Sequence, residues 1–112
     1  MNIDKTLLSG SNALLILKLL EDGDKYGYEM IEELERRSDH TFDMKAGTLY
    51  PLLHTLEGKG WITAYDAQIG GRTRRYYHLT KTGKDALQEK EEAWNHYADG
   101  VRRVLKGGAC LA

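Results

Sequence analysis

The stretch 47-GTLYPLLHTLEGKGWI-62 restricts the fold most strongly, because it combines a helical leucine pattern with an internal proline. Its leucines recur at helical spacing, which predicts an amphipathic helix; they are Leu49, Leu52, Leu53 and Leu56. Pro51 has no amide hydrogen and costs roughly 3 kcal/mol in a helix interior. We expect the helix to begin near Lys45 and to bend at Pro51. The alternative is that Thr48 caps the helix and Pro51 lies in its first turn.

The face of this helix opposite the leucines consists mostly of small side chains. Successive residues lie 100° apart around the helix, which groups Gly47, Pro51, His54, Thr55 and Gly58. The major groove of B-DNA is about 12 Å wide, so a helix with a slender face can lie deep in it. His54 and Thr55 can then reach base edges, while Lys45 and Thr48 near the helix start can meet phosphates. The alternative is an ordinary core helix that tolerates a proline.

Two segments after this helix, WITAYDA at 61–67 and RRYYHLT at 74–80, are rich in aromatic and β-branched residues and predict two strands. The intervening QIGGRT contains two adjacent glycines, which suit the positive φ angles of a tight hairpin turn. Basic residues lie at or beside this turn with one threonine among them: Arg72, Thr73, Arg74 and Arg75. Crowding three guanidinium groups is unfavourable without an anion, so DNA phosphate or the minor groove is a natural partner. The alternative is a solvated loop.

Three further helices are predicted, at 11–22, at about 24–37 and from about 82 to 105. Suitable N-cap residues for these helices are Ser9 or Ser11, Asp24, and Thr80 or Thr82. The order helix, helix, helix, strand, turn, strand, long helix is that of a winged helix-turn-helix with an added helix. We therefore predict a mainly α fold with a β-hairpin (α+β). Residues 1–80 would form a winged helix-turn-helix DNA-binding domain, residues 81–106 a C-terminal dimerisation helix, and residues 107–112 a flexible tail.

The first and last helices carry apolar surface that so small a domain does not cover alone. The core of the first helix, ALLILKLL, is apolar nearly all round, and the last helix repeats an apolar residue every seven positions. That second stripe can pack on its own domain, but three helices and a hairpin already close the domain. We therefore predict a symmetric homodimer, with an interface made of Leu14, Leu17, Leu87, Trp94, Val101 and Leu105.

The 112 residues carry a formal net charge of −1, which alone argues weakly against nucleic acid. The distribution is uneven, because residues 45–84 hold seven basic and two acidic side chains. Phosphates respond to such a local patch. No apolar run reaches the ~18 residues of a transmembrane helix, and no secretory signal is visible. We expect a cytoplasmic protein without a membrane partner, in which the lone Cys110 is incidental.

Patterns for catalysis or metal binding are missing from the sequence. The histidines are scattered over different predicted elements: His40, His54, His78 and His96. No His/Cys cluster has the spacing of a metal site, and no glycine-rich phosphate loop precedes a helix in the required context. We expect neither an enzyme nor a bound metal or cofactor.

Three motifs resemble the PadR family of transcriptional repressors: YGYEMIEEL at 26–34, GTLYPLLHTLEGKGWI at 47–62 and GGRTRRYYHLTKTGK at 70–84. The resemblance covers about residues 7–87, and the three motifs together are highly specific. It implies a dimeric bacterial repressor whose recognition helix enters the major groove and whose wing contacts the neighbouring DNA backbone. With the residue-based reasoning above, the positions expected at double-stranded operator DNA are Tyr26, Lys45, Thr48, Tyr50, His54, Thr55, Arg72, Thr73, Arg74 and Arg75.

A single helix after the wing is similar to the short subfamily of these repressors. Some of them bind flat, hydrophobic, often cationic compounds in a pore at the dimer interface, where an aromatic residue of the last helix stacks on the compound. Trp94 stands at the matching place, near Glu91, Glu92 and Asp99. The resemblance thus implies a small aromatic or cationic effector that relieves repression. The rival hypothesis is a winged helix that binds another protein through its basic wing, without operator DNA.

Overall fold

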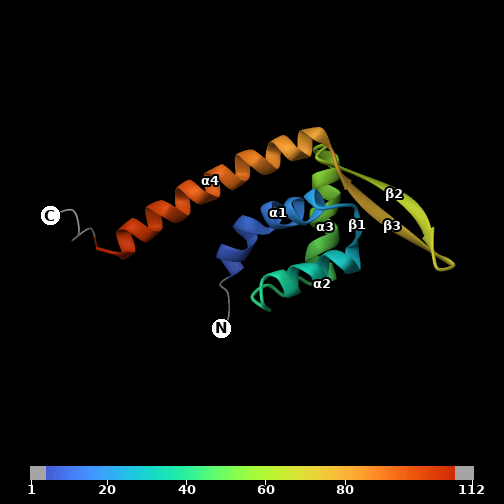
Figure 1. Cartoon of the computed structure of the whole chain (residues 1–112), viewed down its shortest axis with the longest axis horizontal. Helices are drawn as coiled ribbons and strands as arrows, with labels where there is room; N and C mark the ends of the chain where they lie inside the picture. Colours follow the sequence, from blue (N-terminus) through green and yellow to red (C-terminus); the bar gives the residue numbers. More distant parts are fainter. Residues whose placement is uncertain (1–4, 108–112) are drawn as a thin grey trace.

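The computed structural model describes residues 5–107, with side chains from residue 10 onward (Figure 1). In chain order the elements are α1 (Lys5–Glu21), β1 (Lys25–Tyr26), α2 (Gly27–Arg37), α3 (Ala46–Gly58), β2 (Ile62–Ile69), β3 (Arg72–Leu79) and α4 (Lys81–Leu105). The β2–β3 hairpin, called the wing below, and α4 project toward opposite ends of the molecule. The predicted α+β winged helix with a long C-terminal helix is confirmed. Residues 108–112 of the expected tail, with Cys110, lie outside the described residues.

The wing is a regular antiparallel hairpin with a two-residue turn. Its pairing runs from Ile62 opposite Leu79 to Ile69 opposite Arg72. The turn residues Gly70 and Gly71 adopt φ angles of 61° and 78°. A turn with two positive φ angles matches the right-handed twist of paired strands. The predicted hairpin is confirmed, and its strands run up to the turn instead of leaving QIGGRT as a loop.

The third strand, β1, is not predicted by the sequence. Instead of starting a helix at Asp24, the chain pairs β1 with β3, which gives the sheet order β1-β3-β2. The helix α2 then begins at Gly27, with Tyr26 as the N-cap, and the Tyr26 amide donates to the Glu29 carboxylate (3.1 Å). A strand of two residues has no periodicity to detect, which is why pattern analysis misses it.

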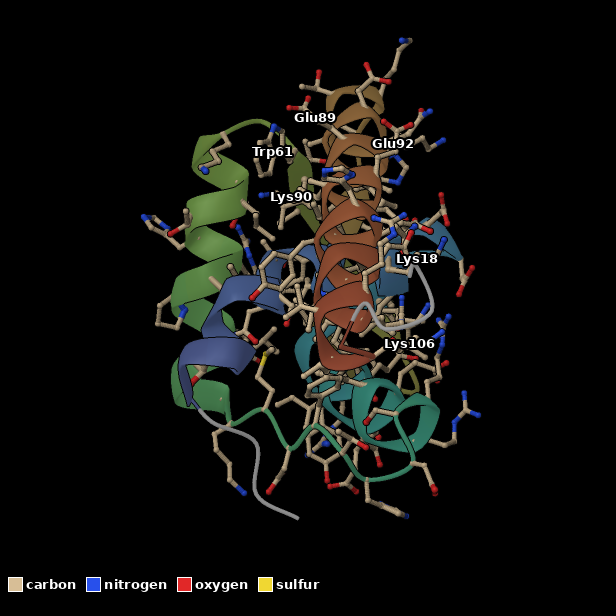
Figure 2. The ribbon with its side chains drawn as sticks, turned by 90° about the vertical axis from the view of Figure 1, so that its left-hand side faces the viewer. Lys18, Trp61, Glu89, Lys90, Glu92 and Lys106 are labelled. Carbon is tan, nitrogen blue, oxygen red and sulfur yellow. The ribbon has the colours of Figure 1, made fainter. Side chains whose placement is uncertain are left out.

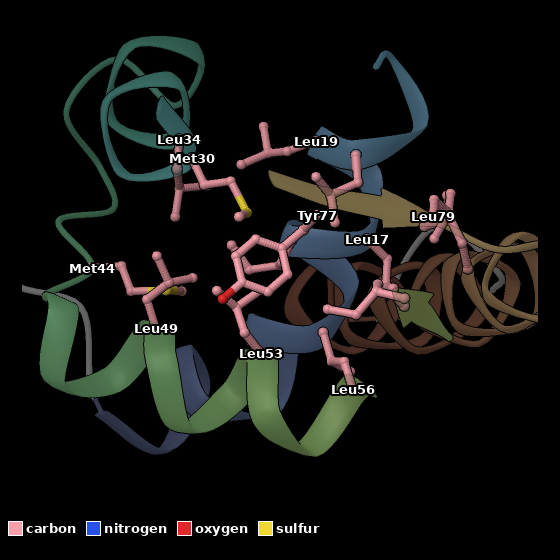
Figure 3. Packing of buried hydrophobic residues seen from close by; sticks show 14 residues of the cluster. Leu17, Leu19, Met30, Leu34, Met44, Leu49, Leu53, Leu56, Tyr77 and Leu79 are labelled. Atoms are coloured by element: carbon pink, nitrogen blue, oxygen red, sulfur yellow. The ribbon is translucent and has the colours of Figure 1, made fainter. Parts of the chain in front are cut away.

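The hydrophobic core lies where α1, α2 and α3 meet the base of the wing. Leu49, Leu53 and Leu56 of α3 are each at most 1 % exposed. Figure 3 shows the Tyr77 ring of β3 lying between these leucines and Met30 of α2. Burying a side chain of this size contributes about 1.5–3 kcal/mol. The leucine face of α3 is therefore held inward, as the sequence predicts.

Two residues expected at the dimer interface belong to this core instead. Leu17 is 0 % exposed and Leu87 is 2 % exposed within one subunit. Leu87 lies in the second turn of α4 and is buried, as is Gly83 in the first turn. Their assignment to the interface is wrong, because helical spacing identifies an apolar face but not the subunit that covers it. The helix α1 also begins at Lys5, six residues before the predicted start.

The start of α4 is fixed against the turn between α3 and β2. Thr80 accepts a hydrogen bond from the Gly83 amide (3.0 Å) and donates one to the Gly60 carbonyl (2.7 Å). Gly83 lies so close to the Trp61 carbonyl that a β-carbon would collide with it. Figure 2 shows Trp61 beside Lys90 of α4, whose ammonium lies 5.3 Å from the ring centre. The base of the wing, the end of α3 and the start of α4 are therefore packed directly against one another.

We expect Gly83→Ala to lower the free energy of unfolding by about 1–3 kcal/mol, because the added methyl group must displace the Trp61 carbonyl. Gly100→Ala in the same helix is the matched control, since a β-carbon there meets no described atom within 4 Å. Better helix propensity should make that control neutral or stabilising by up to about 1 kcal/mol. Urea unfolding at one subunit concentration measures both values. Equal stabilities for the two variants would contradict the close contact at Gly83.

Candidate nucleic-acid interface

The exposed face of α3 carries the residues that the sequence places there. Lys45 is the N-cap, and the exposed helical residues include Gly47, Thr48, Tyr50, Pro51, His54, Thr55 and Gly58. The early start of the helix is confirmed, while the bend at Pro51 stays a prediction. Because the helix begins at Ala46, Pro51 lies inside it, and its nitrogen has no hydrogen to donate to the Gly47 carbonyl. The Thr55 hydroxyl donates to the Pro51 carbonyl (3.1 Å), so its oxygen is left as an acceptor.

Tyr50 links α3 to the first turn of α2. Its side chain is 49 % exposed, and its hydroxyl lies so close to the buried Gly27 that a β-carbon there would collide with it. Tyr28, in the same turn of α2, is 61 % exposed. Tyr28 is the second tyrosine of the YGYE motif, and no local pattern in the sequence identifies it as a contact residue. The start of α2 and the neighbouring part of α3 therefore both present a tyrosine to solvent.

Alternation along β3 divides the basic residues of the wing between its two faces. Arg72 and Arg74 share one face, while Thr73 and Arg75 share the other with Tyr77, which is 4 % exposed. Successive side chains of a strand point to opposite faces. The expected crowding of all three arginines at the tip is therefore wrong, because β3, which begins just after the turn, places Arg75 on the opposite face from Arg72 and Arg74.

The three arginines also differ in their partners. The Arg74 guanidinium lies 4.3 Å from the centre of the Tyr26 ring, in a cation–π contact. Arg75 forms an ion pair with Glu57 of α3 (3.6 Å). Arg72 is exposed and forms no ion pair with any residue from 10 to 107. Arg72 is consequently the wing arginine with the most freedom to bind an external anion.

The outer face of the wing carries a row of three tyrosine rings, one of which is hydrogen-bonded to a carboxylate. Tyr65 and Tyr76, opposite each other on β2 and β3, stack with their ring centres 5.8 Å apart. Tyr26 of β1 meets Tyr76 edge-on at 5.6 Å. Asp24, just before β1, accepts a hydrogen bond from the Tyr65 hydroxyl (2.6 Å) and pairs with Nδ1 of His78 (2.8 Å). These contacts tie the wing to the segment between α1 and α2.

The same contacts shift the pKa values of Asp24 and Tyr65 in opposite directions. The hydrogen bond from Tyr65 lowers the pKa of Asp24, and the pairing with His78 adds to this effect. In return, the bond to Asp24 raises the pKa of the Tyr65 phenol, because the proton is held by the carboxylate. Asp24 is 41 and 54 positions from its two partners. No local pattern connects such distant residues, so the sequence predicts only a helix cap at Asp24.

The C-terminal half of α4 exposes an apolar stripe. Trp94 is 44 % exposed, and it is followed along the helix by the exposed side chains of Tyr97, Val101, Val104 and Leu105. Of the residues expected at a dimer interface, Trp94, Val101 and Leu105 are thus on the surface, and Leu14 of α1 is half-buried. Monomeric soluble proteins rarely expose large continuous apolar patches. An exposed stripe of this kind is typical of surfaces at which soluble proteins contact other molecules.

A surface cavity of about 430 Å³ lies between the end of α1 and the first half of α4. Acidic side chains dominate its lining, with one lysine: Glu21, Lys84, Asp85, Glu91 and Glu92. Trp94 does not line this cavity. A single subunit therefore does not enclose a small molecule against Trp94 there, and the predicted effector position depends on a second subunit.

Two absences apply to the part of the chain that the structure describes. It contains no group of three or more His, Cys, Asp or Glu side chains arranged to hold a metal ion. Within residues 5–107, no helix combines the length and apolarity required to span a bilayer.

Comparison with known proteins finds matches along most of the chain. The family described as transcriptional regulator PadR-like matches residues 16–89. A transcriptional regulator of Mycobacterium tuberculosis is 37 % identical over 94 residues, which cover 84 % of this chain and 82 % of that protein. Among solved structures, a transcriptional regulator from Clostridium thermocellum aligns with a TM-score of 0.82 at 30 % identity, over 88 % of this chain and 96 % of that one. A PadR family regulator from Clostridium difficile aligns with a TM-score of 0.76 at 34 % identity, over 85 % and 98 %.

We expect Asp24→Asn to lower the free energy of unfolding near neutral pH by about 1 kcal/mol, because it weakens the bonds to Tyr65 and His78. The pKa of Asp24 is lowered from 3.8 in the fold. Its contribution is therefore present above pH 3.8 and is lost as the pH falls through the folded pKa. Urea unfolding across this range should show wild type and variant converging in acid.

Tyr65→Phe is the matched variant, because it removes the same hydrogen bond but keeps the ring on Tyr76. Combining it with Asp24→Asn should cost less than the sum of the two single changes. A stability difference that stays constant from neutral pH to strong acid would contradict the assigned role of Asp24.

Proposed function

Because the chain belongs to the PadR-like family of transcriptional regulators, we propose that it is a homodimeric repressor that binds double-stranded operator DNA in the cytoplasm. In this proposal a small hydrophobic or aromatic effector at the dimer interface releases the DNA. The observation that carries the proposal is the outer face of α3, which is exposed, slender and adjacent to a wing with an unpaired arginine. No catalytic step is assigned to the chain.

In the proposed complex, α3 lies in the major groove. His54 and Thr55 face the base edges, and Thr55 offers an oxygen acceptor there. Lys45 and Thr48 lie at the start of α3, where unpaired backbone amides and the helix dipole also favour phosphate. Tyr50 is exposed enough to contact the backbone while it packs on α2.

The wing supplies the second contact of each subunit. Arg72 and Thr73 at its tip are exposed and reach phosphates or the adjacent minor groove. Arg74 stays on the ring of Tyr26, so these two residues approach the backbone together. The excess of basic residues in 45–84 supports this assignment despite the net charge of −1.

A second copy of the chain is the proposed cover for the apolar stripe of α4. The stripe is one-sided and lies on a helix of 25 residues, which suits an isologous helix–helix contact. Trp94, Val101 and Leu105 of the stripe are proposed to line this contact, together with the half-buried Leu14 of α1. Two winged helices at fixed spacing would then face two half-sites of a pseudo-palindromic operator.

The effector position is proposed at Trp94. Its indole is 44 % exposed in one subunit, and a two-fold axis near it would face it with its own copy. A flat aromatic compound between the two rings would gain stacking contacts. The acidic residues Glu91, Glu92 and Asp99 on the same helix favour a cationic compound.

A gel shift with the upstream region of the chain's own gene should show binding that weakens steeply as salt rises. Arg72→Ala should weaken binding to every duplex and flatten the salt dependence, because it removes an unpaired charge from the proposed contact surface. Lys106→Ala is the matched control, since it removes the same charge just after α4, whose C-terminal end lies at the opposite end of the molecule from the wing (Figure 1).

Equal affinities of wild type and Arg72→Ala at low and high salt would refute the role of Arg72. No shift with any duplex, combined with retention of an acidic protein, would instead favour the rival function, a winged helix that binds protein through its basic wing.

In a Trp61→Phe background Trp94 is the only tryptophan, so its fluorescence is unambiguous. We expect its emission to change on adding planar aromatic cations, with acridine orange as the first probe, because the ring stacks on the compound. Val104→Glu is the control: it puts a charge in the exposed stripe and should produce monomers in sedimentation and abolish the response. An unresponsive Trp94 across a broad panel would remove the effector from the proposal, and a dimeric Val104→Glu protein would remove the stripe as the interface.

A further inference from the structure

The surroundings of the three wing arginines differ enough to give them different roles. Arg72, at the tip, is exposed and unpaired within residues 10–107. Arg74 is half-buried against the Tyr26 ring. Arg75 is the one whose guanidinium has two carboxylates within 4 Å, and one of these carboxylates belongs to α3. Arg75 is thus the wing arginine that is bonded to the helix proposed to read DNA.

Arg75 reaches from the wing to the last turn of α3. Its Nη2 lies 3.6 Å from Oε2 of Glu57, and its Nη1 lies 3.9 Å from Oδ1 of Asp66. Asp66 is the residue opposite Arg75 in the hairpin register. Glu57 follows Leu56, which is 1 % exposed and anchors that turn in the core. The Arg75 side chain therefore bridges the wing and the last turn of α3.

The charges around Arg75 do not favour a DNA contact. Two carboxylates face one guanidinium, so the local charge is negative in total. A phosphate that approached the exposed Arg75 would compete with Glu57 and Asp66 and would lie near these two anions. Arg72 has no such competitors, so a phosphate gains more from Arg72 than from Arg75.

We propose that Arg75 and Glu57 are positioning residues that hold the wing at a fixed separation from α3, and that Arg75 is not itself a DNA ligand. The inference rests on the proposed function, because it concerns how two DNA-binding elements are held relative to each other, and it reassigns Arg75 from the predicted DNA contacts. The grooves and phosphates of a duplex have fixed spacing, so α3 and the wing bind together only when their separation matches. Exposed ion pairs contribute little to global stability, so the role lies in geometry.

Glu57→Gln separates positioning from simple electrostatics by the sign of its effect. If charge alone mattered, removing a carboxylate beside the DNA-binding surface would raise the affinity for a polyanion. Positioning predicts the reverse, an affinity about two- to tenfold lower with an unchanged thermal midpoint. The probe is a fluorescein-labelled duplex from the upstream region of the chain's own gene. Asp43→Asn is the matched control, because it frees Lys45 from its ion pair (2.8 Å) and should raise the affinity.

Arg75→Gln should weaken binding by a similar factor and leave the slope of log affinity against log salt close to that of wild type. Arg72→Gln should flatten that slope, because it removes a phosphate contact. The double variant Glu57→Gln with Arg75→Gln should bind no more weakly than either single variant, since both remove one interaction. A slope reduced by Arg75→Gln as much as by Arg72→Gln, additive losses in the double variant, or a Glu57→Gln protein that binds as well as or better than wild type would each overturn the proposal.

A measurement without DNA tests the positioning role of the Arg75–Glu57 ion pair independently of the proposed function. Spin labels on His54→Cys and Gln68→Cys, in a Cys110→Ser background, report the distance between exposed positions of α3 and the wing. Mixing labelled with unlabelled chains suppresses distances between subunits. The distance distribution should broaden in Glu57→Gln and in Arg75→Gln but not in Arg72→Gln. Unchanged distance distributions would overturn the positioning role of Arg75 and Glu57, whereas a wild type that binds no duplex would count against the proposed function alone.

Discussion

The burial of the α3 leucines beneath Tyr77 decides which side of α3 can meet another molecule. With Leu49 and Leu53 at most 1 % exposed, turning the helix about its axis would bring leucines to water and carry His54 into the core. Tyr77 also belongs to β3, so the same contact decides which face of the wing is turned toward α3. Because side chains alternate along a strand, an inward Tyr77 places Arg75 on its own face and turns Arg72 and Arg74 away. One packed cluster therefore orients both the helix and the arginines.

Local patterns predict much of this molecule, and the failures share one cause. The α3 leucines and the Gly70-Gly71 turn follow short-range rules of helical period and backbone angle, and both are confirmed. The two-residue strand β1 depends on pairing with β3, far along the chain, and is missed. The prediction that Leu17 and Leu87 contact a second subunit fails because spacing shows that a helix face is apolar but not what covers it. The candidate DNA residues on α3 are exposed as expected, whereas the partners of Arg74 and Arg75 come only from tertiary structure.

The wing is held on both faces by residues distant in sequence. On the outer face Asp24 bonds to Tyr65 and His78, and on the inner face Glu57 pairs with Arg75. A two-stranded hairpin is marginally stable by itself in water. Here the aromatic row, the two carboxylates and the third strand supply contacts that an isolated hairpin lacks. In the structure, these contacts link the wing both to α3 and to the segment between α1 and α2.

The close packing at Gly83 fixes the first turn of α4, while the rest of this long helix extends away from that contact. This packing leaves no room for a methyl group between the helix and the Trp61 carbonyl, so the first turn of α4 and the end of α3 have little freedom to slide past each other. A helix of 25 residues is about 37 Å long. Rotating a rod of that length by about 5° around one end moves the other end by about 3 Å. A displacement of a few ångström at the far tip of α4 therefore corresponds to only a few degrees of tilt where α3 ends.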